Sequence, residues 1–454
     1  MKIIKNIPVW ICPALLLVAN ISQSAVSEAE AHNLGKNLTP FGAEMAGNSE
    51  GTIPAWTGGL TAPPHSFNAE SGQYVDPFSE EKPVLTITAA NFKQYAEKIS
   101  AGQKELFRKY PDSYQMQVFP SHRTHAAPQW IYDAIRKNAV TATISEDGNS
   151  VSGVNNGIAF PIPKSGSEVI WNHLTRWEGR AARAESFGSL VVESDGTVNA
   201  TIGSASIRHP LYSADPDNND LLQIVQVFKT PARKKGEALL VKDPMNQAAS
   251  PRQAWQYIPG QRRVRRAPSV AHDTPQDNLG GYITFDDGFV FNGSPERFEW
   301  KLMGKKEMYI PYNNYKIFDG LSEDLTVNKD VYRANHLNPD YTRWELHRVW
   351  VVEASLKDDS RHIYQKRVFY IDEDSWHAAM SDSYDTRGNI WKTSVNHLFQ
   401  EYRNPGISTR NMIVYDLNAN VYVAENTDFK MREVLDSLPD NLFTPQYVRS
   451  MSTR

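Results

Sequence analysis

The stretch Gln253-Ala-Trp-Gln-Tyr-Ile-Pro-Gly-Gln-Arg-Arg-Val-Arg-Arg-Ala-Pro268 decides the fold prediction for this chain. An alternating aromatic run ends at Pro259-Gly260, a pair that breaks a strand with a turn. Side chains alternate along a strand, so Trp255 and Tyr257 share one face. The arginines that follow then place guanidinium groups on both faces. The stretch therefore predicts a β-hairpin with a strongly cationic second arm.

Arginine guanidinium groups bind carboxylates and phosphates through two parallel hydrogen bonds. The arginines at positions 262, 263, 265 and 266 therefore indicate a contact for the anionic headgroup of a ligand or for a partner. An alternative is a solvated hairpin whose arginines pair with acidic residues of other strands, such as Glu345 and Glu353. The sequence leaves both interpretations open.

Strand patterns dominate the chain after about residue 188, where the hydrophobic period changes to two. Turn-forming residues separate the strands, for example at Lys235-Gly236 and Arg387-Gly388-Asn389. Because neighbouring strands lie close in sequence, we expect an antiparallel meander. The expected strands are Leu190–Val192, Leu221–Phe228, Glu237–Val241, Gln253–Arg266, Tyr341–Leu356, His362–Ile371, Asn389–Tyr402 and Met412–Val423.

Helical spacing of apolar residues marks three segments of the N-terminal part: Ala89–Tyr110 with Thr88 as its N-cap, Trp130–Ala139, and the second half of Asn155–Trp177. A short helix is also expected at Lys430–Leu438. Helices and strands together predict a β-dominated α+β fold, in which helices from the N-terminal third pack against one large sheet.

The N-terminus has the pattern of a secretory signal at residues 1–24, in which Lys2 and Lys5 precede an apolar stretch and small residues follow. Residues 25–85 are rich in Gly, Pro, Ser and Thr, and they predict an extended surface segment or a partly disordered tail. Residues 86–454 are expected to form a single large domain. The one cysteine, Cys12, lies inside the signal, so the mature chain has no disulfide and no cysteine nucleophile. Export without disulfides indicates the bacterial periplasm.

Bulk charge argues against nucleic acid as a partner, because 48 Lys and Arg residues against 52 Asp and Glu residues give a net charge of −4. No segment after the signal contains about 18 consecutive apolar residues, so we expect no membrane-spanning helix. Aromatic residues make up 11% of the chain. This content suits a β-rich protein, a broad apolar pocket, or both.

Motifs for catalysis and metal binding are weak. Gly47-Asn-Ser-Glu-Gly51 matches the G-x-S-x-G pattern of a nucleophile elbow, but it lacks the strand before it and the helix after it that the elbow needs. The twelve histidines include no H-E-x-x-H pair. Asp372, Glu373 and Asp374 indicate an acidic β-turn rather than acid/base groups or calcium ligands, because the other oxygen ligands of a calcium loop are missing. We therefore expect no catalytic residue, no metal and no cofactor.

With these runs in view, the sequence resembles a known family. The run 253–268 is similar to the central motif of the bacterial DUF1329 family, whose members are often labelled outer membrane lipoprotein-sorting proteins. Three further runs resemble the same family: Leu38–Gly59 its mature N-terminus, Phe160–His173 its second motif block, and Lys366–Trp376 its late strand pair. The four runs span nearly the whole mature chain.

The resemblance implies a fold like that of the periplasmic lipoprotein carriers, a curved and incomplete antiparallel β-barrel whose open side is closed by helices. It also implies partners, namely a resistance-nodulation-division transporter and a large outer-membrane barrel. The simple lipoprotein carriers are less than half as long, so the N-terminal part of this chain has no counterpart in them. The family supplies no catalytic residues to transfer.

The resulting hypothesis is a periplasmic, non-catalytic carrier or adaptor that passes a lipid or another hydrophobic molecule between membranes, with only transient membrane contact. An apolar cavity in the half-barrel would shelter this ligand from water. The expected ligand-binding residues are Trp255, Tyr257, Trp300, Trp350 and Trp391 in the cavity, with Arg263 and Arg265 at the polar headgroup. Two alternatives stay open. One is a periplasmic hydrolase of a hydrophobic ester, which needs a converging Ser-His-Asp set or a metal. The other is an accessory subunit of an outer-membrane complex that binds no small molecule.

Overall fold

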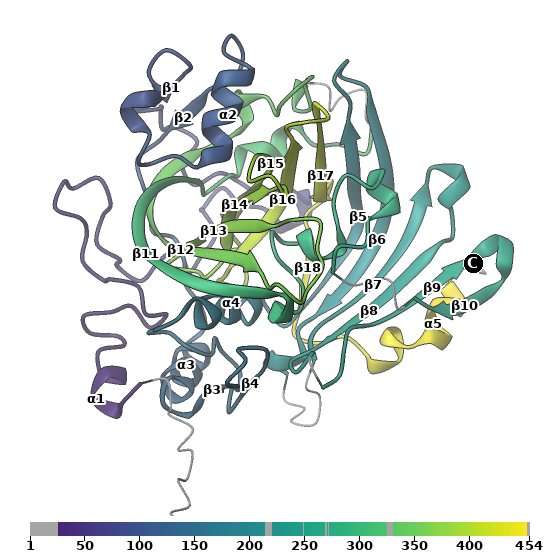
Figure 1. Ribbon diagram of the computed structural model, residues 1–454, viewed down its shortest axis with the longest axis horizontal. Helices are drawn as coiled ribbons and strands as arrows, with labels where there is room; N and C mark the ends of the chain where they lie inside the picture. The colour runs from purple at the N-terminus through teal and green to yellow at the C-terminus, as the bar shows by residue number, and fades with distance from the viewer. Residues whose placement is uncertain are drawn as a thin grey trace, which may run out of the picture.

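The structure is a computed structural model of the chain, and it describes residues 26–213, 220–247, 249–267, 270, 272–324 and 330–451. The predicted secretory signal, residues 1–24, lies outside the described residues. Within them, one sheet joins sixteen strands and a separate ladder pairs two short strands. Figure 1 shows the large sheet running from the strongly curved β11 and β12 at one side to β9 and β10 at the other.

The order of the large sheet is β1-β2-β12-β13-β14-β15-β16-β17-β5-β6-β7-β8-β9-β10, with β11 paired to β12 and β18 paired to β5. The separate ladder consists of β3 (Thr143–Ile144) and β4 (Val151–Ser152). The strands of the large sheet are β1 (Leu85–Ile87), β2 (Met116–Val118), β5 (Ala181–Val192), β6 (Val198–Arg208), β7 (Asp220–Thr230), β8 (Ala238–Pro244), β9 (Gln253–Ile258), β10 (Arg263–Arg266), β11 (Phe298–Pro311), β12 (Trp344–Leu356), β13 (Lys366–Asp372), β14 (Ala378–Tyr384), β15 (Ile390–Gln400), β16 (Ile407–Asp416), β17 (Val421–Asp428) and β18 (Glu433–Leu435).

The large sheet is open. Among its described long strands, β10 pairs only with β9 and β11 pairs only with β12, so each leaves a free edge, as do the short strands β1 and β18. Two antiparallel meanders, β11–β17 and β5–β10, are joined where β17 pairs with β5, with Tyr422 opposite Val192. Among the described strands of this sheet, the one parallel pairing is the bridge between Trp344 and Val118. The structure thus confirms the prediction of a β-dominated fold built on an incomplete antiparallel barrel.

The sequence patterns miss β6, β11 and β14, as well as the short strands β1–β4 and β18. The single strand predicted over Met412–Val423 is wrong, because a turn separates β16 from β17 there. β6 and β14 are rich in Ala and Ser, and β11 carries three lysines and a register shift next to Gly304. Their own strand propensity is low. Strand partners on both sides of β6 and β14 supply the backbone hydrogen bonds that stabilise them.

The helices of the described residues are α1 (Glu28–Ala31), α2 (Ala101–Lys109), α3 (Gln129–Thr141), α4 (Gly166–Leu174) and α5 (Pro445–Met451). The prediction of one helix over Ala89–Tyr110 is wrong, because a 3-10 turn at Phe92–Tyr95 is followed by a separate start of α2. The Ser100 hydroxyl accepts from the Gln103 backbone (3.2 Å), and the Gln103 side chain accepts from the Ser100 backbone (2.8 Å). This capping box, rather than Thr88, sets the start of the helix.

The helix predicted at Lys430–Leu438 is also wrong. That segment contains β18, whose Val434 lies opposite Ala182 of β5. The pairing of β17 with β5 extends no further than Phe187, so the first residues of β5 need another partner on that side. β18 supplies it, and these backbone hydrogen bonds outweigh the helical spacing of the side chains.

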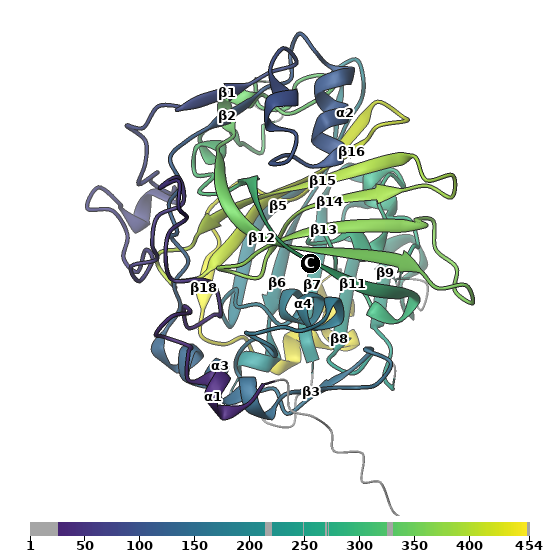
Figure 2. The same cartoon turned by 60° about the vertical axis from the view of Figure 1, so that its left-hand side comes forward.

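Side chains cover both faces of the central strands. On one face, Leu106 and Phe107 of α2 belong to a large buried cluster, and on the other, Val169, Ile170 and Trp171 of α4 belong to a second. β14 and β15 are accordingly buried along nearly their whole length instead of alternating. Figure 2 shows α4 and α2 on different sides of the strands. The middle of the sheet is therefore packed by the protein itself.

A buried ion-pair cluster fixes the loop before β11 to the sheet. Arg367 of β13 is fully buried and donates to Asp286 (3.3 Å), Asp287 (3.0 Å) and the carbonyl of Val290 (2.9 Å). Burial opposes ionisation of Asp286, but the charge of Arg367 and a hydrogen bond from His362 outweigh it and lower the pKa of Asp286. Asp286 is thus held in its charged form beside Arg367.

Glu425 of β17 provides a pH test of this packing. Burial raises the pKa of Glu425 to about 7, and its Oε2 has no hydrogen-bond partner. The unfolded chain loses this proton at lower pH than the folded chain, so Glu425 lowers the free energy of unfolding as pH rises from its ordinary pKa to about 7. We expect Glu425→Gln to stabilise the protein by about 2 kcal/mol at pH 8 and by much less at pH 5. Urea unfolding at both pH values measures this. The exposed Glu299→Gln should show no such pH dependence.

Candidate functional site

The arginine-rich stretch forms a hairpin at the open edge of the sheet. β9 and β10 pair antiparallel, with Arg263 opposite Ile258 and Arg266 opposite Trp255. A 3-10 turn at Pro259–Gln261 connects them, and Arg262 closes it in the left-handed conformation (φ 50°). In Figure 1 the hairpin lies at the edge of the molecule, next to α5.

One face of the hairpin is covered by the C-terminus. Tyr257 is buried, and Trp255 packs with it in a cluster that includes Phe443 and Val448. Because paired residues of an antiparallel ladder point to the same side, Val264 and Arg266 share this face. The two aromatic residues therefore pack against α5 and the segment before it.

Arg263 and Arg265 lie on the opposite face. Arg265 of β10 lies opposite Gln256 of β9, and Gln256 also lies opposite Leu239 of β8. Leu239 in turn lies opposite Gln226 of β7, so these four residues form one row across the sheet. The neighbouring row on this face contains Ala254, Val241 and Ile224. Ile224, Leu239, Val241 and Ile258 are only half-buried. We call these four residues the apolar strip.

The four arginines are exposed, and among the described residues no ion pair includes them. Glu345 pairs with Arg343 and His347, and Glu353 lies 3.9 Å from Lys366. The alternative in which these glutamates neutralise the arginines is therefore wrong. The adjacent turn between β7 and β8 adds exposed Arg233 and Lys235, because Ala238 pairs with Tyr257 and brings the two turns together. This end of the sheet concentrates positive charge.

The structure does not bring the other predicted aromatic residues to the hairpin. Trp300 donates to the carbonyl of Pro295 (2.9 Å) and packs on Phe369. Trp350 stacks on Trp376 with ring centres 6.2 Å apart. Trp391 donates to Asp416 (3.1 Å). Each of the three is half-buried within the meander β11–β17, whereas Trp255 and Tyr257 lie in the other meander.

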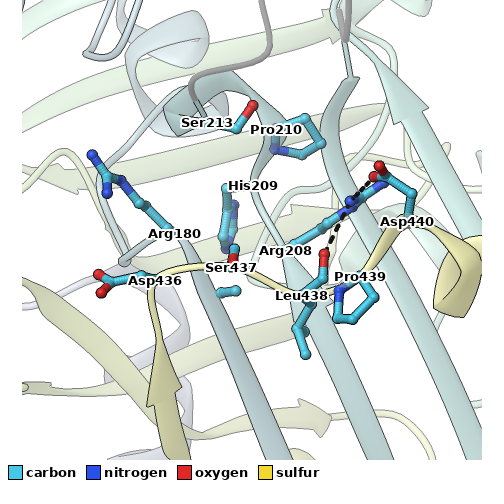
Figure 3. Close-up of a pocket in the computed structure, with 11 residues that line it drawn as sticks. Arg180, Arg208, His209, Pro210, Ser213, Asp436, Ser437, Leu438, Pro439 and Asp440 are labelled. Carbon is cyan, nitrogen blue, oxygen red and sulfur yellow. Dashed lines mark hydrogen bonds and ion pairs between the residues drawn. The ribbon is translucent and has the colours of Figure 1, made fainter.

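Two cavities flank the wing formed by β7–β10. One of about 390 Å³ lies between the start of β5, the end of β6 and the C-terminal segment, and Figure 3 shows Arg208 reaching from its wall to Asp440 and the carbonyl of Leu438. Burial lowers the pKa of His209, in the same wall, to about 4. The other, of about 480 Å³, is lined by polar residues that include Arg252, Arg266 and Glu296. The predicted aromatic residues line neither cavity.

Hydrolase chemistry finds little support in the described residues. Ser49 of the G-x-S-x-G match lies in a loop without a preceding strand or a following helix. The Ser113 hydroxyl lies 2.9 Å from His336 Nε2, but His336 Nδ1 faces the carbonyl of Leu337 at 2.8 Å. A Ser-His-Asp triad has a carboxylate at that second nitrogen. Neither serine is therefore part of a triad.

The apolar strip was not predicted from the sequence. Only part of its signal is present in the sequence, because Ile224 on β7 and the apolar run Leu239-Leu240-Val241 on β8 put apolar residues on both faces of these strands. Only the register of the ladder shows that these residues share a face with Arg263 and Arg265. Across the described residues, every helix is too short or too polar to cross a membrane.

Comparison with known proteins identifies the family. The model of the family described as "Protein of unknown function (DUF1329)" matches residues 86–449. The chain is also 40% identical over 452 residues to the uncharacterized protein PA3922 of Pseudomonas aeruginosa, with 97% of each chain covered. This chain belongs to the DUF1329 family. The resemblance seen in the four sequence runs is thereby confirmed.

Three solved structures are similar to this DUF1329 protein at a lower level. A putative outer membrane lipoprotein-sorting protein domain from Vibrio parahaemolyticus is 15% identical, with a TM-score of 0.43 over 62% of this chain and 97% of that chain. A DUF1329 family protein from Desulfovibrio piger is 14% identical, with a TM-score of 0.41 over 60% and 92%. A LolA superfamily protein from Nitrosomonas europaea is 14% identical, with a TM-score of 0.36 over 63% and 99%. At these TM-scores the likenesses say nothing about a ligand.

The four sequence runs of this DUF1329 chain divide into two groups in space. Trp376 donates to the carbonyl of Phe41 (2.9 Å), and His173 accepts from the backbone of Ala378 (3.0 Å). The runs Leu38–Gly59, Phe160–His173 and Lys366–Trp376 thus meet around the turn between β13 and β14 and stabilise the core. The run 253–268 stands apart at the open edge, where its arginines face solvent.

Proposed function

We propose that this protein is a non-catalytic periplasmic carrier or adaptor for an amphiphile with an anionic headgroup. One observation carries the proposal: the apolar strip and the exposed Arg263 and Arg265 lie on one face at the open end of the sheet. The headgroup would meet the two guanidinium groups, and the tail would lie along Ile224, Leu239 and Val241. An amphiphile joins these two chemistries in one molecule.

The expected binding free energies of tail and headgroup both favour an amphiphile as the ligand. Covering apolar surface contributes about 25 cal/mol per Å², so a long acyl chain on the strip offsets a large part of the cost of association. Hydrogen bonds to charged groups contribute about 1.5–3 kcal/mol each, and guanidinium groups bind phosphate in a fork. Solvent screens exposed arginines, so the headgroup contribution should weaken with added salt.

The periplasmic location rests on the sequence. The predicted signal at residues 1–24 contains the only cysteine, Cys12, and the rest of the chain has none. A chain of this length buries a core without disulfides. The predicted signal and the open, cationic wing support a protein that meets membrane amphiphiles after export.

Replacing Arg263 and Arg265 together by glutamine tests the headgroup contact. We expect the variant to bind a fluorescent acyl-phosphatidylglycerol probe at least about tenfold more weakly at low salt, because it loses charge-assisted hydrogen bonds to phosphate. A matched probe with a phosphocholine headgroup carries no net charge, so the double substitution should reduce its affinity much less. Fluorescence titration of both probes measures the difference.

Two further variants separate headgroup from tail. Arg387→Gln removes an exposed arginine from the turn between β14 and β15, and it should leave both affinities unchanged. Val241→Gln places a polar side chain in the apolar strip, so it should weaken the binding of both probes to a similar extent. The proposal fails if wild-type protein binds neither probe and carries no lipid after native purification, or if the double arginine variant binds the anionic probe as tightly as wild type.

A second function has one observation in its favour. Both faces of the central strands are packed by the protein itself, and β10 leaves an open strand edge at the cationic hairpin. This arrangement suits an accessory subunit that binds a partner of a membrane complex, such as a resistance-nodulation-division transporter or an outer-membrane barrel, without a small molecule. A stable complex with such a protein, together with no lipid in mass spectra, would favour this function.

A further inference from the structure

A buried polar pocket lies where β12 meets the turn between β13 and β14. His347, Asp372 and Asp374 each offer one ligand atom, and these atoms all lie within 4.8 Å of one another. The three residues are at most 3% exposed. Val349 pairs with Asp372, so continuing the register by two residues places His347 opposite Asp374. The sheet itself therefore brings the three side chains together.

Nδ1 of His347 and Oδ1 of Asp372 face each other without a hydrogen bond between them. His347 Nε2 lies 3.2 Å from Glu345 Oε2, a carboxylate oxygen that can only accept, so Nε2 donates to Glu345 and Nδ1 faces Asp372. Asp372 Oδ2 accepts from the backbone (3.0 Å) and hydroxyl (2.6 Å) of Ser375, whereas Asp372 Oδ1 has no hydrogen-bond partner. Nδ1 and Oδ1 are 3.7 Å apart. This separation is too long for a hydrogen bond.

The neighbouring carboxylates all have counter-cations. Arg123 binds Asp374 through two contacts (2.8 and 2.6 Å), and Lys305 and Arg348 pair with Glu373. Arg343 pairs with Glu345. Asp372 differs, because His347 is its only ion-pair partner among the described residues. Asp372 is therefore the carboxylate of this pocket that pairs with no lysine or arginine of the described residues.

Two further buried groups point to a missing occupant. The Tyr312 hydroxyl has no hydrogen-bond partner, and the Tyr312 ring packs on the His347 ring with centres 4.2 Å apart. Both ring nitrogens of His125 are likewise buried and unpartnered, close enough to Asp374 for its charge to act on them. Buried polar groups without partners are rare in native proteins, and each calls for a ligand, an ion or a water.

We propose that His347, Asp372 and Asp374 hold a structural zinc ion. Zinc takes imidazole nitrogen and carboxylate oxygen at about 2.0–2.2 Å, which puts two tetrahedral ligands about 3.4 Å apart, close to the observed 3.7 Å. The hydrogen bond from Nε2 of His347 to Glu345 is the carboxylate contact that metal-bound histidines usually make. Tyr312 or a water supplies the fourth position. The ion would link β12 to the turn between β13 and β14, and through Arg123 to the segment before α3.

Metal content and refolding test the site on the full chain. Protein purified without chelators should contain about one zinc per chain by inductively coupled plasma mass spectrometry. Protein unfolded with a chelator and refolded with zinc should melt at least about 3 °C higher than protein refolded without zinc, because the ion binds only the folded state. Folded protein with no bound metal and no effect of zinc on refolding would overturn the proposal. A proton or a water would then occupy the pocket.

Variants give a second, independent readout. Asp372→Asn and His347→Gln should lose the zinc and lower the melting temperature. The matched control is Asp382→Asn on β14, a buried aspartate that accepts from Ser100, Gly102, Tyr370 and Thr393 and should keep the zinc. If the pocket holds only a proton or a water, Asp372→Asn should be tolerated or stabilising, because it removes a buried carboxylate that lacks a cation. Zinc retained by Asp372→Asn would also overturn the assignment.

Discussion

Arg367→Met should cost about 3–5 kcal/mol of unfolding free energy, because it leaves buried carboxylates without their cation. Arg367 is fully buried, and its guanidinium lies against the rings of Phe291 (5.4 Å), Tyr364 (5.2 Å) and Phe369 (4.9 Å). Methionine fills similar space but donates no hydrogen bond to Asp286 or Asp287. The loss should therefore come from unpaired charge rather than from a cavity.

The pH dependence of the Arg367→Met effect identifies its cause. In wild type the pKa of Asp286 is depressed, so the stability that this group contributes is present above its ordinary pKa and is lost as pH falls below it. Without Arg367 that contribution disappears, and acid neutralises the unpaired carboxylates. The difference between variant and wild type should thus shrink as pH falls from 7 to about 4.

Urea unfolding followed by tryptophan fluorescence measures this difference at each pH. Arg387→Met is the matched control, because Arg387 is exposed in a turn and its replacement should change stability by no more than about 0.5 kcal/mol. A cost for Arg367→Met that is small, or that stays constant with pH, would contradict the charge explanation.

The sequence predicts the sheet well because its strand signals are local. The hairpin at Pro259-Gly260 follows from alternation and turn chemistry, and the structure places Arg263 opposite Ile258 as a short turn requires. The junction of β17 with β5 has no such signal, because Tyr422 and Val192 pair although they lie far apart in sequence. Long-range pairing of this kind depends on the whole fold.

The site was predictable only in part. The cationic character of Arg263 and Arg265 is visible in the sequence, but their partners on the same face depend on register. Trp255 and Tyr257 illustrate the limit. Their alternation predicts a shared face correctly, whereas the cover of that face by Phe443 and Val448 comes from a C-terminal segment that no local pattern connects to them. Alternation shows which side chains share a face, not what covers that face.

Gly42→Ala is expected to destabilise the protein by about 3 kcal/mol or more, since a left-handed conformation and a clash both resist the added methyl group. Gly42 has φ +91°, and a Cβ there would lie 1.8 Å from the carbonyl oxygen of Pro161. The obstacle is backbone, so no side-chain rotation relieves it. Gly42 follows Phe41, whose carbonyl accepts from Trp376. The substitution should therefore loosen the N-terminal segment from the turn between β13 and β14.

Gly51→Ala separates the two causes of the Gly42 effect. Gly51 also has a left-handed backbone (φ +70°), but nothing lies within 4 Å of its added Cβ. Its replacement should cost only about 1 kcal/mol, which is the backbone strain alone. Thermal unfolding gives both values, and limited proteolysis of residues 38–59 reports detachment of the segment. Equal losses for Gly42→Ala and Gly51→Ala would mean that Pro161 can move away, and that the N-terminal segment is packed less tightly on the core than these contacts indicate.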